Sequence, residues 1–216
     1  MPAVFKYILL ILMSIVIVSV WITSPPQRNL GDISRIFYFH VPVAWISVLA
    51  FAAAMVNSIL YLKKKNLNYD IRASISAKLG LMFSIIATVS GAIFAKATWM
   101  SYWNWDPRQT SILILILIYG AYLALRSAVE DEERRAALSS VYSIIAFVTV
   151  PFLVFVIPRV YQTLHPTDTI IDSSGSIQMS PIVLFIFLSS IFCFTLIYAW
   201  LYRLHSIIEI ESRNKN

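Results

Sequence analysis

Two histidines and one tryptophan-rich segment are the residues of this chain best suited to bind a ligand. His40 and His165 are two of only three histidines, and imidazole nitrogens are common metal ligands. Residues 96–106 read KATWMSYWNWD and hold three of the six tryptophans, namely Trp99, Trp103 and Trp105. Indole rings offer large, flat apolar surfaces. The two features together indicate a flat apolar ligand that carries a metal, provided that the fold brings them together.

The composition predicts a membrane protein. The 216 residues are 59% hydrophobic with a mean hydropathy of +0.75, more apolar surface than a soluble domain of this size could bury. A helix of about 20 apolar residues spans the hydrocarbon layer. Six such runs predict an all-α, six-transmembrane-helix bundle, with 1–216 forming one membrane domain. The expected spans are 5–23, 41–62, 79–95, 107–125, 141–157 and 181–202.

The distribution of Lys and Arg sets the expected orientation. Twelve of the 17 lie at the chain ends or in the loops on the side of both termini, and five lie on the opposite side. Because basic residues in short loops stay in the cytoplasm, both termini are expected to be cytoplasmic. The outer loops are then 24–40, 96–106 and 158–180, which places His40, the tryptophans and His165 on one face. The net charge of +6 follows from this topology and from attraction to anionic lipid, and it indicates no nucleic-acid partner.

The tryptophan cluster has two interpretations. Trp and Tyr favour the headgroup level of a bilayer, but such a belt spreads over all helix ends, whereas this cluster lies in one loop. If the loop is helical, Trp99 and Trp103 are four residues apart and form a flat shelf on one face. Asp106 before Pro107 is a typical helix start, with Asp106 as the N-cap that aims the loop.

The histidines are predicted to bind haem iron. His40 is expected just outside the second span, where the positive end of the helix keeps the imidazole neutral. Two histidines from separate segments can then ligate iron from opposite faces of the ring. The haem propionates could pair with the outer cations Arg35, Lys96, Arg108 and Arg159. The lone Cys193 and the lack of a Cys-x-x-Cys-His motif indicate non-covalent haem b.

Other classes of function are less well supported. The predicted span interiors contain essentially no charged residues or histidines, which argues against a pump, a channel or an intramembrane hydrolase. We therefore expect no enzymatic activity. One alternative is a small-molecule transporter with an aromatic outer gate. Another is a structural subunit whose aromatic loop only docks a partner. His205, expected on the inner side, is a natural control.

Three motifs together resemble the CcmC/CcsA family of WWD-domain proteins, which handle haem in cytochrome c maturation. The first is Trp99 followed by Trp103, Trp105 and Asp106; the second is Tyr38-Phe39-His40-Val41-Pro42-Val43-Ala44-Trp45; the third is Thr163-Leu164-His165. The chain departs from the family pattern at Met100, where Gly is usual, at Tyr102, where Trp is common, and at Pro107, where Ala is common.

The resemblance implies a haem-transfer protein of the bacterial inner membrane. His40 and His165 would be axial haem ligands, and Trp99, Trp103, Trp105 and Asp106 would form the loop that holds the apolar edge of the haem. The implied partners are a CcmE-type haem chaperone, the ABC transporter subunits CcmA and CcmB, the small subunit CcmD and membrane lipid.

Overall fold

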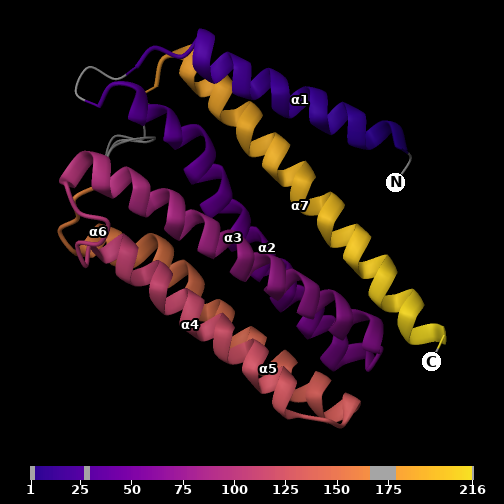
Figure 1. The fold of residues 1–216 in the computed structure, drawn as a ribbon. Coiled ribbons are helices and arrows are strands. Elements are labelled where there is room, and N and C mark those ends of the chain that lie inside the picture. The colour runs from indigo at the N-terminus through magenta and orange to yellow at the C-terminus, as the bar shows by residue number, and fades with distance from the viewer. Residues whose placement is uncertain (1–2, 27–29, 166–178, 216) are drawn as a thin grey trace.

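The computed structural model describes residues 3–26, 30–165 and 179–215, and these contain helices but no strand (Figure 1). Six helical stretches are long and apolar enough to cross a membrane, so the all-α fold and its six spans are confirmed. The elements are α1 (Ala3–Ile22), η1 (Asp32–Ile36, a 3-10 turn), α2 (Phe37–Lys64), α3 (Leu67–Trp99), α4 (Pro107–Ala128), α5 (Glu132–Pro151), η2 (Phe152–Val156, a π turn), α6 (Ile157–Val160) and α7 (Pro181–Lys215).

The helices form a bundle in which α2 packs against α3, α5 and α7, while α1 packs against α7. In Figure 1, α1 lies along α7 at one edge, α2 and α3 occupy the middle, and α4 and α5 form the opposite edge. The α2–α3 and α4–α5 turns and the C-terminus lie at one end, toward which the N-terminus also points. The other end, called the site end below, carries η1, α6 and residues 100–106. His40, the tryptophans and His165 therefore come to the same end of the bundle.

Several helices extend beyond the predicted spans. α3 begins at Leu67 rather than at residue 79, and α7 continues to Lys215 rather than ending at 202. The predicted spans are apolar runs, so they stop where charged residues lower the hydropathy, whereas the helices continue. α3, for example, includes Asp70, which has only 3% of its surface exposed.

Asp70 is buried because it pairs with Arg126. The two guanidinium nitrogens donate to the two carboxylate oxygens at 2.6 and 2.8 Å, joining the first turn of α3 to the last turn of α4. Each charge also faces the favourable end of its own helix dipole. A bidentate, charge-assisted pair of this kind is strong and geometrically specific. It holds the α3–α4 pair together at the end opposite the site.

Two glycines of α3 allow α2 to approach closely. A Cβ at Gly80 would lie 2.5 Å from the Phe51 ring, and one at Gly91 would lie 3.0 Å from Cε1 of His40. The two glycines are eleven residues apart, about three helical turns, and so lie on one face. This close packing is what sets the position of the site end of α2 against α3.

The fifth span is interrupted near the site end. Pro151 ends α5, and the N–H of Ile157 then bonds to the carbonyl of Phe152, five residues back, before Pro158. Proline removes a helical hydrogen bond, and single π turns within helices often occur at functional sites. Leu153, Val154 and Pro158 all line the cavity described below.

Candidate haem site

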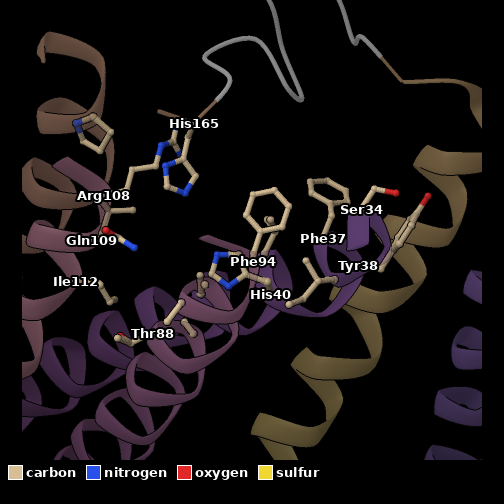
Figure 2. Close-up of a pocket in the computed structure, with 18 of the residues that line it drawn as sticks. Ser34, Phe37, Tyr38, His40, Thr88, Phe94, Arg108, Gln109, Ile112 and His165 are labelled. Atoms are coloured by element: carbon tan, nitrogen blue, oxygen red, sulfur yellow. The ribbon is translucent and has the colours of Figure 1, made fainter. Parts of the chain in front are cut away.

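A cavity of about 470 Å³ opens at the site end of the bundle. Its walls come from the chain before and within α2, from α3, α4, η2 and α6, and from residues around the start of α7. His40, Trp103, Arg108 and His165 are among its lining residues. Figure 2 shows His40 and His165 entering from different elements, with Arg108 and Gln109 beside His165 and Phe94 beside His40. The fold therefore brings the two predicted ligands into one cavity.

His40 lies within α2, not outside it. The helix begins at Phe37 and follows directly from η1, so the expectation that His40 precedes the helix is wrong. Its orientation comes from α3, because the ring Nδ1 lies 2.9 Å from the hydroxyl of Ser90. That hydroxyl donates its own proton to the carbonyls of Ile86 and Ala87. A hydroxyl that uses its proton in this way accepts from His40, an arrangement in which Nδ1 carries the proton and Nε2 keeps its lone pair.

Gly91 provides the space for the His40 ring, which gives a testable prediction. In Gly91→Ala the new methyl would lie 3.0 Å from Cε1, the atom between the two ring nitrogens, so the imidazole must move. We expect haem affinity to fall by about tenfold, the lower end of the usual effect of disturbing an outer-shell contact. Titration of the purified apoprotein with haemin measures this affinity.

The matched control for this prediction is Gly120→Ala in α4. A Cβ at Gly120 meets no atom within 4 Å, so this variant makes the same chemical change without a steric effect on the cavity. Equal affinities for the two variants would show that Gly91 has no role in placing His40.

His165 is held by the carboxylate of Asp106. Its Nδ1 lies 3.1 Å from Oδ1 of Asp106, whose side chain is fully buried, while the imidazole is 22% exposed. The ring also contacts Trp99 edge to face, with the ring centroids 4.8 Å apart. Burial lowers the pKa of His165, against the opposing effect of the Asp106 charge. The lowered pKa favours the neutral imidazole, which has a lone pair for a metal.

Asp106 caps α4 as predicted and also accepts hydrogen bonds from the segment before His165. Oδ1 accepts from the N–H of Arg108 at 2.9 Å. Oδ2 accepts from the hydroxyl of Thr163 at 2.7 Å and from the N–H of Leu164 at 2.6 Å. Burial alone would raise the pKa of Asp106, but these three hydrogen bonds outweigh it and the pKa is lowered. Asp106 is thus an ionised carboxylate that ties the segment before His165 to the start of α4.

The tryptophan loop is not helical. α3 ends at Trp99, and Met100 follows in the left-handed conformation, so the helical geometry that would align Trp99 with Trp103 is absent. The three tryptophans instead have different surroundings. Trp99 contacts His165, Trp103 lines the cavity, and Trp105 is 71% exposed with its ring edge against Trp103 at a centroid distance of 5.7 Å.

Gln109 fixes the shape of this loop. Its amide oxygen accepts from the N–H of Asn104 at 2.8 Å, and its amide nitrogen donates to the carbonyl of Tyr102 at 3.2 Å. Four supporting residues of the site were not predicted from the sequence: Gln109, Ser90, Gly91 and Thr163. Only Thr163 could have been found from the sequence, because it belongs to the third motif. The other three belong to no motif, and they act through partners that lie far away in the sequence or in another element.

Met100 gives a prediction about stability. Its φ is +62°, a conformation that costs a residue with a Cβ roughly 1–2 kcal/mol and that glycine adopts freely. The side chain is 76% exposed, so little packing is lost with it. We expect Met100→Gly to raise the free energy of unfolding by about 1 kcal/mol, measured by thermal unfolding in detergent. Met100→Ala removes the side chain but keeps the strain, so a similar gain in that variant would contradict the explanation.

The four predicted partners of the propionates differ in position. Arg35 donates to the carbonyls of Val20, Trp21 and Ser24, Lys96 to that of Met100, and Arg159 to that of Phe155. Arg108 is the one of the four that lines the cavity. The geometry therefore favours Arg108 for a carboxylate of a bound ligand.

Comparison with known proteins identifies the family. The model of the family described as Heme exporter protein C, CcmC, matches residues 1–216. Proteins named Heme exporter protein C share 30% identity over 153 residues in Bradyrhizobium diazoefficiens (71% of this chain, 58% of the relative) and 28% over 194 residues in Rhodobacter capsulatus (88% and 78%). The protein of that name from Haemophilus influenzae is 28% identical over 213 residues, 97% of this chain and 86% of the relative. The chain therefore belongs to the CcmC family, Heme exporter protein C.

Proposed function

We propose that this chain binds one haem b without a covalent bond, between His40 and His165, and transfers it during cytochrome c maturation. The observation that carries the proposal is that two imidazoles 125 residues apart in the sequence line one cavity. Each has its Nδ1 hydrogen-bonded to the protein, so each can present Nε2 to a metal.

The residues present fit a haem. The cavity volume of about 470 Å³ lies in the range of roughly 300–1,000 Å³ that is usual for cofactor pockets. Its lining is largely apolar, with Arg108 available for a propionate. Among the described residues, no group of three or more His, Cys, Asp and Glu side chains could hold a bare metal ion. A haem would supply four ring nitrogens itself, so the imidazoles of His40 and His165 would be the two remaining ligands of its iron.

The loop contributes apolar contacts rather than a flat shelf. Trp103 faces the cavity, and Trp99 supports His165 from the side. Trp105 and Tyr102 are 71% and 60% exposed. We assign Trp99, Trp103 and Asp106 to holding the haem and its ligand, and Trp105 to the exposed surface beside them.

The proposal includes the route of the haem. With both termini cytoplasmic, as the distribution of Lys and Arg favours, the site end lies at the outer face of a bacterial inner membrane. There the haem would pass to a CcmE-type haem chaperone, with CcmA, CcmB and CcmD as further partners. The exposed aromatic side chains Tyr102 and Trp105 are of a kind enriched in protein interfaces.

The experiment that tests this function is the absorption spectrum of the purified protein, followed by incubation with an apo haem chaperone. We expect a haem spectrum with two nitrogen ligands, and loss of that haem to the chaperone. Transport of a small molecule by the chain alone in liposomes, without haem, would instead support the alternative of a transporter with an aromatic gate.

A further inference from the structure

The two candidate ligands, His40 and His165, differ in the group that contacts their Nδ1 atom. The Nδ1 of His165 faces a carboxylate oxygen of Asp106 at 3.1 Å, whereas the Nδ1 of His40 faces a neutral hydroxyl of Ser90 at 2.9 Å. Both contacts are long-range, spanning 59 and 50 residues of sequence. The same ring atom is thus supported by a charge in one histidine and by a dipole in the other.

The contacts of Asp106 fix the proton of His165. An ionised carboxylate is an acceptor only and has about four lone-pair positions. Here it accepts four hydrogen bonds, from Arg108, Thr163, Leu164 and His165. Nδ1 must therefore carry the proton, and Nε2 is the nitrogen left for iron. Because all four partners are fixed, the carboxylate cannot turn away without breaking the cap of α4.

A carboxylate behind an imidazole also changes the bond that the imidazole makes. It draws the Nδ1 proton toward itself and so raises the electron density at Nε2, which strengthens the bond to a metal. A serine hydroxyl does this much less, because it carries no net charge. The protein therefore gives its two imidazoles unequal strength as ligands.

We propose that Asp106 is a positioning residue that makes His165 the stronger of the two axial ligands and leaves His40 the weaker one. The inference rests on the proposed haem site. His40 is then the ligand that yields first when haem leaves, while His165 retains it until a partner takes over. This inequality would give the two ligands a defined order of release.

The experiment compares haem affinity and reduction potential in Asp106→Asn, Asp106→Ala and Ser90→Ala. Asn retains the N-cap and an acceptor oxygen for Nδ1. It loses the charge, and its amide nitrogen cannot accept the hydrogen bonds that Oδ2 accepts from Thr163 and Leu164. We expect Asp106→Asn to keep the two-nitrogen spectrum and to shift the reduction potential to more positive values, because a less electron-rich ligand stabilises ferric iron less.

We expect Asp106→Ala to lose 10-fold to 100-fold in haem affinity and Ser90→Ala to lose less. Thr163→Val is the matched control, because it removes the hydroxyl that donates to Asp106 and accepts from the N–H of His165 but keeps the charge. It should shift the potential less than Asp106→Asn does.

The outcomes separate this inference from the proposed function. If Asp106→Asn leaves the potential unchanged, or shifts it no more than Thr163→Val, the role of the Asp106 charge is refuted while the haem site stands. If His165→Ala itself leaves the spectrum unchanged, the haem site is refuted. A larger loss of haem from His165→Ala than from His40→Ala supports the inequality, and the reverse order overturns it.

Discussion

Replacing Asp70 by alanine is expected to lower the free energy of unfolding by about 3–5 kcal/mol. The substitution leaves Arg126, whose side chain is only 13% exposed, buried without its partner. Removing one member of a buried ion pair is costly because the remaining charge has lost both its counter-ion and its water. Thermal unfolding in detergent, followed by circular dichroism, measures the loss. It should occur without a specific change in the haem ligands, because the pair lies at the end of the bundle opposite the site.

The matched control is the ion pair between Lys78 and Glu209, with side chains 52% and 37% exposed and atoms 3.3 Å apart. Exposed pairs contribute roughly 0–1 kcal/mol, so Glu209→Ala should change stability little. A double substitution, Asp70→Leu with Arg126→Met, removes both charges and should recover most of the loss. Equal effects of Asp70→Ala and Glu209→Ala would contradict the structural role given to the buried pair.

Most of the fold could be predicted from the sequence, because membrane spans depend on local hydropathy. The six spans and the start of α4 at Pro107 agree with the prediction. The family is one of heme exporters, which confirms both the recognised resemblance and the expectation of a protein that is not an enzyme. The start of α3 and the end of α7 lie outside the predicted bounds, because both helices continue through charged residues such as Asp70 in α3.

The details of the site depend on contacts that hydropathy does not encode. The pairs His40–Ser90 and Asp106–His165 join residues 50 and 59 positions apart. Asp106 shows the difference clearly. Its role as a cap was predicted from its neighbour Pro107. Its contact with His165 depends on the packing of the segment after α6, and it was not predicted.

The aromatic loop shows how a local assumption can mislead. A shelf of Trp99 and Trp103 requires the helix to continue for one more turn. It ends instead at Trp99, because Met100 adopts the left-handed conformation that closes many helices. The family pattern already indicated this ending. Gly is usual at this position in the family, and glycine is also the residue that most often follows the end of a helix in the left-handed conformation.

Substitution of either cavity histidine is expected to have the second large effect. His40→Ala and His165→Ala each remove one of the two imidazoles that line the cavity and leave no other described histidine there to replace it. Losing an axial ligand removes a direct bond to iron. Loss of a group that only supports a ligand already costs about tenfold or more, so we expect haem content to fall by at least about tenfold. The residual haem should have one nitrogen ligand rather than two.

His205→Ala is the matched control, because His205 lies in the C-terminal part of α7, which runs to the end of the bundle opposite the site (Figure 1). The most direct measurement is the absorption spectrum of purified wild-type protein beside these three variants at equal protein concentration. The haem site predicts a two-nitrogen haem spectrum in the wild type and in His205→Ala, and its loss in both His40→Ala and His165→Ala. An unchanged haem content and spectrum in those two variants would contradict it.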